Sequence, residues 1–128
     1  MAATVGLRIL IFDDLEDEPT LGAYLRRAAP DCEVETCNEA RECIDIALRF
    51  EPHLILLDLA MPGMSGCEVA NRLRKLVIRP FVLVACTCFA DSATRDQCLA
   101  NGFNYVLPKP GLDQLLRMIA VARKFAEL

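Results

Sequence analysis

The 128-residue chain has no tryptophan, a single histidine, and no apolar run long enough to span a membrane. A transmembrane helix needs about 18 or more consecutive apolar residues, and Met1 to Gly6 lack the basic start of a secretory signal. Basic residues are also in the minority, because 14 lysines and arginines face 18 aspartates and glutamates, giving a net charge of −4 and a pI near 5.0. We therefore expect a cytoplasmic protein without a membrane contact and without direct binding to nucleic acid.

Cysteine pairs with the spacing of a metal site are missing too. The seven cysteines form an odd-numbered set without a C-x-x-C pair, and His53 is the only histidine that could act as a co-ligand. This pattern argues against a zinc site and against a secreted disulfide framework. Most of the cysteines fall within apolar segments, where cysteine packs as a small hydrophobe, so we expect them to be reduced.

Short apolar runs alternate with helical patterns along the chain. Hydrophobic residues make up 54% of the sequence, so its length suffices for one well-buried domain, expected to span residues 1–128. The runs typical of buried strands cover residues 7–13, 32–37, 53–58, 80–87 and 103–110. Apolar residues in the segment after each run recur every three or four positions, as in amphipathic helices. Such alternation predicts an α/β fold, a doubly wound five-stranded parallel sheet with helices on both faces.

Five residues mark four expected helix ends. Asn38 is placed to cap the second helix, and Ser65 with Glu68 forms an S-x-x-E capping box at the start of the third. Asp91 is placed to cap the fourth helix, which we expect to stop before Gly102.

Residues with reactive side chains gather where the expected strands end. Asp13 and Asp14 follow the first strand, Asp58 ends the third, Thr87 ends the fourth, and Lys109 lies at the end of the fifth. Each of these residues taken alone is common in turns. In a doubly wound sheet, however, the carboxyl ends of the strands form one edge, and ligands bind there. Three carboxylates packed together repel one another unless a cation lies among them, and an oxygen-rich site with room for water suits Mg²⁺. The pattern therefore predicts a magnesium site into which Asp58 emerges.

The sequence resembles the receiver domains of two-component response regulators from about Leu7 to Phe125. The segments that carry the resemblance are IFDD at 11–14, LILLDLAMPGMSG at 54–66, VACT at 84–87 and LPKP at 107–110. The resemblance implies the flavodoxin-like (βα)5 fold with strand order 2-1-3-4-5 and makes Asp58 the phosphoacceptor. The implied magnesium ligands are Asp13, Asp14, Asp58 and the backbone carbonyl of Ala60. The residues implied to contact the phosphoryl group are Thr87 and Lys109. The family also has a cis peptide at the position of the Lys109–Pro110 bond.

The resemblance implies a phosphorelay component, not a turnover enzyme. A histidine kinase or a histidine phosphotransfer protein would donate a phosphoryl group to Asp58 with the help of Mg²⁺. Closure of Thr87 on the new dianion would then alter a protein-binding surface. The sequence does not name the output partner, and the last helix and fifth strand are available to a homodimer or to another protein.

Three other functions fit parts of this pattern. Haloacid-dehalogenase-type phosphatases share a strand-end aspartate nucleophile, but they have a second aspartate two residues later, where this chain has Ala60. A flavodoxin-like carrier needs a phosphate-binding loop rich in Thr, Ser and Gly, whereas the segment DDLEDEP at 13–19 would repel a flavin phosphate. A receiver-like binding module that is never phosphorylated remains the third alternative, and the complete set of site residues argues against it.

Two positions depart from the usual pattern of the family. Cys88 follows the fourth strand where the family usually has a very small residue, and a thiol there narrows the approach of a phosphoryl donor. The family commonly has Tyr or Phe three residues before the position of Lys109. This chain has Val106 there, and the aromatic Tyr105 lies one residue earlier. Because strand side chains alternate, we expect Tyr105 to face away from Val106, so that activation changes residues 88–91 without an aromatic rotation.

Overall fold

Five parallel strands form the centre of the molecule in a computed structural model that describes residues 6–12, 21–59, 64–87, 91–108 and 112–126. The strands are β1 (Arg8–Phe12), β2 (Glu33–Cys37), β3 (Leu54–Asp58), β4 (Val82–Thr87) and β5 (Tyr105–Pro108). Their order in the sheet is β2-β1-β3-β4-β5, so β2 and β5 are the outer strands. The predicted fold class and strand order are therefore confirmed.

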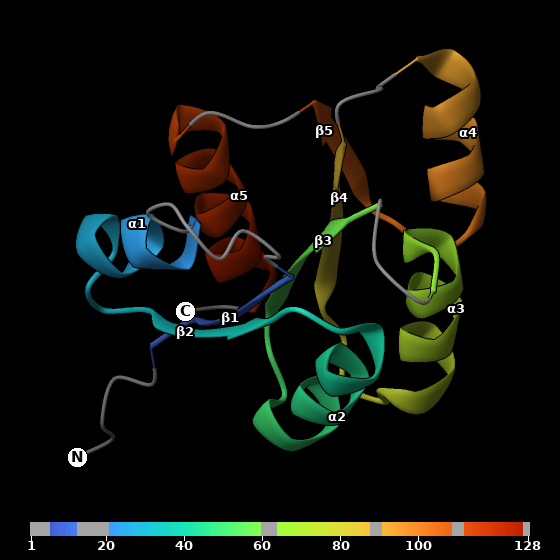
Figure 1. Cartoon of the computed structure of the whole chain (residues 1–128). Coiled ribbons are helices and arrows are strands. Elements are labelled where there is room, and N and C mark those ends of the chain that lie inside the picture. The colour runs from blue at the N-terminus through green and yellow to red at the C-terminus, as the bar shows by residue number, and fades with distance from the viewer. Residues whose placement is uncertain (1–5, 13–20, 60–63, 88–90, 109–111, 127–128) are drawn as a thin grey trace.

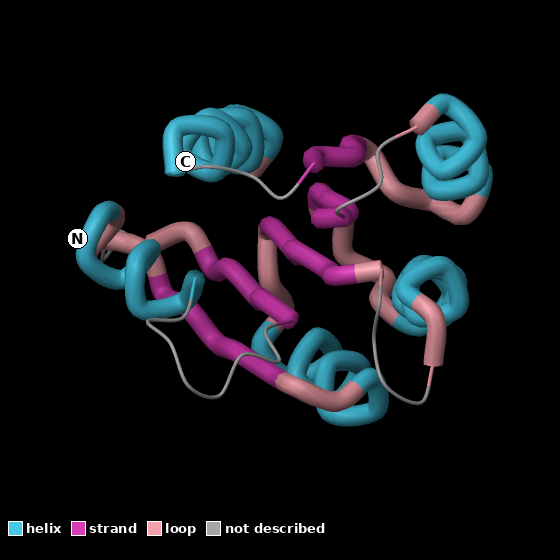
Figure 2. Tube along the Cα trace, turned by 45° about the horizontal axis from the view of Figure 1, so that its top comes forward, coloured by secondary structure: helices cyan, strands magenta, loops and turns pink. Residues whose placement is uncertain are grey.

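A helix follows each strand and covers one face of the sheet. The helices are α1 (Leu21–Ala28), α2 (Ala40–Phe50), α3 (Gly66–Leu76), α4 (Ser92–Ala100) and α5 (Leu112–Phe125). Figures 1 and 2 show α1 and α5 on one face of the sheet and α2, α3 and α4 on the other. None of the helices in the described ranges combines the length and the apolar character needed to cross a bilayer.

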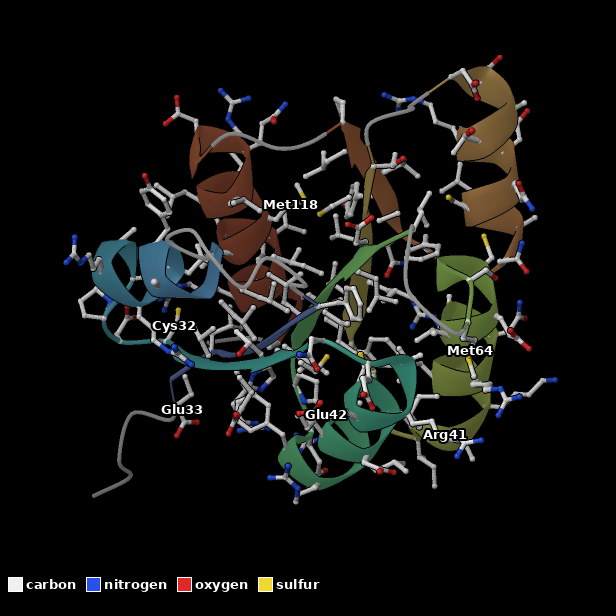
Figure 3. All side chains as sticks on the ribbon, in the orientation of Figure 1. Cys32, Glu33, Arg41, Glu42, Met64 and Met118 are labelled. Atoms are coloured by element: carbon white, nitrogen blue, oxygen red, sulfur yellow. The ribbon has the colours of Figure 1, made fainter. Side chains whose placement is uncertain are left out.

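Two hydrophobic cores lie on opposite faces of the sheet. The α2–α4 core consists of Leu10, Phe12, Cys37, Ala40, Cys43, Ile44, Ile46, Ala47, Ile55, Leu57, Val69, Ala70, Leu73, Phe81, Leu83, Ala85, Cys98, Phe103 and Val106. The α1–α5 core consists of Leu7, Ile9, Ile11, Leu25, Ala29, Cys32, Val34, Leu54, Leu56, Val82, Val84, Leu115, Ile119 and Ala122. Met118 of α5 and Cys32, the residue before β2, lie on this second side (Figure 3). Neighbouring residues of each inner strand alternate between the two cores, which explains why these strands are apolar throughout.

Local hydrogen bonds confirm three of the predicted helix ends. The Ser65 side chain accepts a hydrogen bond from the backbone N–H of Glu68 at 3.2 Å, and Asp91 Oδ1 accepts from the N–H of Thr94 at 2.7 Å. At the end of α4, Gly102 has a φ of +101°. The backbone N–H of Gly102 donates to Leu99 O and that of Phe103 donates to Cys98 O. This paired arrangement is a Schellman motif, which requires a left-handed residue and therefore favours glycine.

The expected cap of α2 by Asn38 is wrong. The N-cap is Glu39, one residue later, and its side chain makes no capping hydrogen bond. The Glu39 carbonyl accepts the N–H of Cys43, which begins the helix through the backbone. The buried residues Cys43 and Ala47 place the apolar side of α2 on the sheet, so tertiary packing sets this helix end without a side-chain cap.

Candidate functional site

Asp58 and Thr87 end the neighbouring strands β3 and β4 at the carboxyl edge of the sheet. In the register of this pair, Asp58 lies opposite Cys86, one residue before Thr87. The Asp58 side chain is partly exposed, whereas Thr87 is only 7% exposed. The structure thus brings an accessible carboxylate and a shielded hydroxyl to adjacent strand ends, as the sequence predicted.

The start of α3 packs directly against the chain that follows Asp58. The Leu59 N–H donates to Cys86 O at 3.4 Å, and the Gly66 N–H donates to Leu59 O at 3.3 Å. A Cβ atom on Gly66 would lie 2.9 Å from Leu59 Cα and 3.2 Å from Asp58 O. Only glycine fits this close approach without a backbone shift, so α3 can start this close to the end of β3 only because its first residue is Gly66.

The remaining predicted site residues, Asp13, Asp14, Ala60 and Lys109, lie outside the described residues, as do Cys88 and the Lys109–Pro110 bond. In the sequence, Asp13 and Asp14 directly follow Phe12, the last residue of β1. β1 pairs with β3 up to Ile11 opposite Leu56. Within the described ranges, no group of three or more histidine, cysteine or acidic residues could hold a metal ion.

Cys86 is a neighbour of the candidate site that the sequence reasoning did not assign. Its side chain is partly exposed and lies opposite Asp58 in the β3–β4 register. The signal that could have found it is the parallel pairing itself, because it places the residue before Thr87 beside Asp58. The thiol therefore belongs to the surroundings of the candidate phosphoacceptor.

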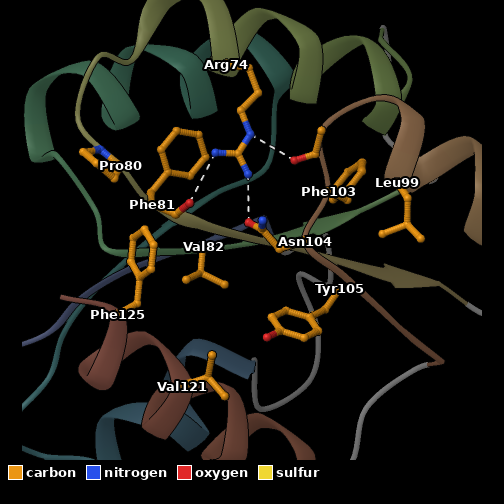
Figure 4. Close-up of a pocket in the computed structure, with 11 residues that line it drawn as sticks. Arg74, Pro80, Phe81, Val82, Leu99, Phe103, Asn104, Tyr105, Val121 and Phe125 are labelled. Atoms are coloured by element: carbon orange, nitrogen blue, oxygen red, sulfur yellow. Dashed lines mark hydrogen bonds between the residues drawn. The ribbon is translucent and has the colours of Figure 1, made fainter. Parts of the chain in front are cut away.

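Tyr105 and Val106 face opposite sides of β5, which confirms the expected alternation. Val106 is buried in the α2–α4 core. Tyr105 is 41% exposed and lies towards α5, in a groove that it shares with Val121 and Phe125 (Figure 4). Tyr105 therefore does not occupy the position where the family usually has an aromatic ring.

That groove, of about 570 Å³, lies at the amino end of β4, the opposite end of the strand from Thr87. Its lining residues are Arg74, Pro80, Phe81, Val82, Leu99, Gly102, Phe103, Asn104, Tyr105, Val121 and Phe125. The Arg74 guanidinium lies 4.3 Å from the centroid of the Phe81 ring and donates to Asn104 Oδ1 at 2.8 Å. Burial lowers the pKa of Arg74. The groove is separate from the candidate site, because it lies at the other end of β4.

Comparison with known proteins gives both a family and a fold. The sequence profile of the response regulator receiver domain matches residues 9–120. Protein-glutamate methylesterase/protein-glutamine glutaminase 2 of Rhodopseudomonas palustris (strain BisB18) is 31% identical over 107 residues, which are 82% of this chain and 29% of that protein. The chain thus spans about three tenths of the length of this curated relative.

Two solved structures have the same fold. One is a chain of the Saccharomyces cerevisiae complex between the histidine phosphotransfer protein Ypd1 and the receiver domain of Ssk1, with a TM-score of 0.79, 25% identity, and coverage of 93% of this chain and 90% of that one. The other is the receiver domain of the sensor histidine kinase PA1611 from Pseudomonas aeruginosa PAO1, which has a magnesium ion coordinated in its active-site cleft. Its TM-score is 0.78, with 24% identity, 91% of this chain covered and 96% of that chain.

Proposed function

This chain belongs to the response regulator receiver domain family, and from this premise we propose that it accepts one phosphoryl group on Asp58 and switches a protein-binding surface. The family membership itself supports a phosphoacceptor role in two-component signalling. The observation that carries the assignment to Asp58 is its position at the carboxyl edge, partly exposed, one register step from the shielded Thr87. We take the whole of residues 1–128 as one receiver domain.

The proposed chemistry is an in-line displacement at phosphorus. An Asp58 oxygen attacks, a bond from that oxygen to phosphorus forms, and the phosphorus–nitrogen bond of a phosphohistidine donor breaks. Both reactants are anionic, so the transfer needs positive charge beside the phosphoryl oxygens. In this proposal the Lys109 ammonium supplies part of that charge. The product is an aspartyl phosphate that stays on the chain, so the domain acts as a phosphoacceptor and not as a turnover enzyme.

Magnesium is the metal that this proposal requires, and receiver domains bind it generally, as the Pseudomonas aeruginosa neighbour illustrates. The partly exposed Asp58 carboxylate suits a hard cation that keeps some of its water. We propose Asp13, Asp14, Asp58 and the carbonyl of Ala60 as the ligands. When bound, the ion would neutralise charge on the phosphoryl oxygens.

We propose a histidine kinase or a histidine phosphotransfer protein as the donor. The similarity to a receiver domain complexed with a phosphotransfer protein in yeast supports this class of partner. A cytoplasmic location is part of the proposal, and none of the six described cysteines is in a disulfide. The output partner is a protein, and the exposed Leu116 and Phe125 of α5 make that helix available to it or to a second copy of the chain.

The decisive experiment is phosphorylation by acetyl phosphate with Mg²⁺, followed by intact-mass spectrometry. The wild-type chain should gain the mass of one phosphoryl group in an acid-stable, hydroxylamine-labile form, and the Asp58→Ala variant should gain none. Asp45→Ala is the matched control, because Asp45 is an exposed aspartate on α2 away from the strand ends, and it should label as the wild type does. Full labelling of Asp58→Ala would overturn the assignment, and a folded wild-type chain that never labels would favour the unphosphorylated binding module.

A second variant tests the metal ligands. Asp13→Ala should weaken Mg²⁺ binding, measured by calorimetric titration, without lowering the free energy of unfolding in metal-free buffer. The reason is that removing one of several crowded carboxylates also relieves their repulsion. Unchanged Mg²⁺ affinity in this variant would remove Asp13 from the proposed ligand set.

A further inference from the structure

Helices α3 and α4 lie side by side, and specific hydrogen bonds join their carboxyl-terminal halves (Figures 1 and 2). Asn71 Nδ2 donates to Asn101 Oδ1. One turn further along α3, Arg74 Nε donates to Gly102 O at 2.9 Å (Figure 4). Each helix connects two parallel strands that are neighbours in the sheet, so the two helices run in the same direction. These two hydrogen bonds hold the carboxyl-terminal end of α4 against α3.

One turn towards the amino end of both helices, the thiols of Cys67 and Cys98 are neighbours joined by a hydrogen bond. Cys67 lies four residues before Asn71, whose Nδ2 also donates to Cys67 O at 3.1 Å. Cys98 lies three residues before Asn101, whose N–H donates to Cys98 O at 3.0 Å. Cys98 belongs to the α2–α4 core, and Cys67 packs against the same core. Burial, together with the adjacent Cys67 thiol that hydrogen-bonds to it, raises the pKa of Cys98 to about 11.

The two thiols differ in their access to solvent. Cys98 is 0% exposed, whereas Cys67 is partly exposed. A second pair of neighbouring thiols, Cys37 and Cys43, lies at the β2–α2 connection, where both residues are buried. A hydrogen bond with Cys43 and burial raise the pKa of Cys37. Among the described residues, Cys67–Cys98 is thus a cysteine pair with one member open to a dissolved oxidant, and Cys37–Cys43 is a comparable pair with both members buried.

We propose that Cys67 and Cys98 form a redox modification site, at which hydrogen peroxide closes a disulfide between α3 and α4. In the first step the Cys67 sulfur attacks one peroxide oxygen, the O–O bond breaks, and the leaving hydroxide takes up a proton to become water. In the second step the Cys98 sulfur attacks the Cys67 sulfenic acid, the S–S bond forms, and the S–O bond breaks with release of water. Overall, two thiols give two electrons and two protons to one peroxide, producing a disulfide and two waters.

The disulfide would restrain α4, a helix with only one buried residue. Among the residues of α4, only Cys98 is buried, whereas α2 buries five residues and α3 buries four. α4 follows β4, the strand that ends in Thr87, so the crosslink acts on the element next to the candidate site. Closing a loop from Cys67 to Cys98 also reduces the freedom of the unfolded chain. This inference does not depend on phosphorylation of Asp58.

Peptide mapping of the oxidised full chain tests the crosslink. Reduced protein is treated with stoichiometric hydrogen peroxide, alkylated in urea, and digested with trypsin without reduction. Trypsin separates Cys67 and Cys98 into peptides 50–72 and 96–117, each with a single cysteine. We expect a linked 50–72/96–117 species, an intact mass lower by two hydrogens, a Tm higher by several degrees, and slower amide exchange in α4.

Two comparisons control the experiment. The Cys37–Cys43 pair should remain alkylatable at the same peroxide dose, because its thiols are buried. Cys67→Ala, at a partly exposed position that tolerates a smaller side chain, should fold and should lose the linked species and the Tm increase. The inference is overturned if Cys67 is oxidised to sulfinic acid while Cys98 stays alkylatable, if Cys67 links to another cysteine, or if α4 exchange is unchanged in the crosslinked protein.

Discussion

The side chain of His53 accepts a hydrogen bond from the backbone at the start of β1. The Arg8 N–H donates to His53 Nδ1 at 2.9 Å, and the His53 N–H donates to Arg8 O at 2.8 Å, so the ring takes the place of a backbone acceptor at the start of β1. Burial, followed by the nearby charges of Arg8 and Arg79, lowers the pKa of His53 below its ordinary value of 6.5. Protonation would also remove the lone pair that accepts the Arg8 N–H.

This depressed pKa predicts that the domain loses stability on mild acidification. Between pH 6.5 and the lower pKa of the folded state, the unfolded chain binds more protons at His53 than the folded chain does. The contribution of His53 to the free energy of unfolding is therefore fully present above about pH 6.5 and decreases as the pH drops through that window. Urea unfolding at pH 7.0, 6.0 and 5.0 would measure this decrease in the free energy of unfolding.

His53→Asn is the matched control for that prediction. The asparagine side chain offers an acceptor near the position of Nδ1 but does not titrate, so the variant should lack the His53 part of the pH dependence. The difference in unfolding free energy between wild type and His53→Asn should shrink as the pH falls from 7 to 5. Parallel curves for the two proteins would contradict the assigned role of the ring.

At the residue level, the sequence predicted side chains whose role is decided within a few positions. Ser65, Asp91 and Gly102 were identifiable because a helix end depends only on residues three or four positions away. Tyr105 and Val106 were placed correctly because strand side chains alternate. The contact of Arg74 with Asn104 was not predicted, since it joins residues 30 positions apart and depends on how α3 packs beside the segment between α4 and β5.

At the level of elements, α4 has only one buried residue, so we expect its stability to depend strongly on its two ends. Gly102 has a φ of +101°, and a Cβ atom there would lie 2.9 Å from Arg74 Cγ. We therefore predict that Gly102→Ala lowers the free energy of unfolding by about 1–2 kcal/mol, which urea denaturation would measure. Ala100→Gly, at the last residue of α4, is the control and should cost no more than about 0.5–1 kcal/mol, because it introduces no clash. An unchanged stability of Gly102→Ala would show that the Schellman motif does not anchor the helix.

The same helix provides the expected response to activation. Because Tyr105 lies towards α5 and Val106 has little χ1 freedom, we predict that beryllofluoride with Mg²⁺ draws Thr87 towards Asp58 without an aromatic rotation. Residues 88–91 and α4 should shift instead. Structures with and without beryllofluoride measure this difference. An inward rotation of Tyr105 with residues 88–91 unmoved would contradict it.

Strand patterns were the strongest signal for the elements, and strand ends were the strongest signal for the site. Asp58 and Thr87 end β3 and β4 as predicted, because apolar runs buried on both faces stop where charge or a hydroxyl appears. The predicted strands extended beyond the observed ones, as at Pro80 and Phe81 before β4, because hydrophobicity alone does not reveal where pairing with a neighbour begins. Cys86 was missed for a related reason, since its proximity to Asp58 depends on register.

At the scale of the whole molecule, one sheet couples the two cores. Leu56 and Leu57 are consecutive residues of β3, are 2% and 0% exposed, and belong to opposite cores. We predict that Leu56→Ala and Leu57→Ala each lower the free energy of unfolding by about 2–5 kcal/mol. Each variant should still unfold in one transition, with far-ultraviolet circular dichroism and tyrosine fluorescence giving the same midpoint. Separate midpoints in either variant would mean that the two faces unfold independently.

The outer strands have a consequence for behaviour at high concentration. The β2 edge carries the exposed Glu33 and the half-buried Glu35, and β5 is only four residues long and ends at Pro108. Negative charge repels a second copy at one edge, and at the other a short strand ending in a residue without an N–H gives an incoming strand little to pair with. The two outer strands of the described sheet are therefore poor templates for strand addition, so we expect fibrils to start from molecules that have lost an outer strand.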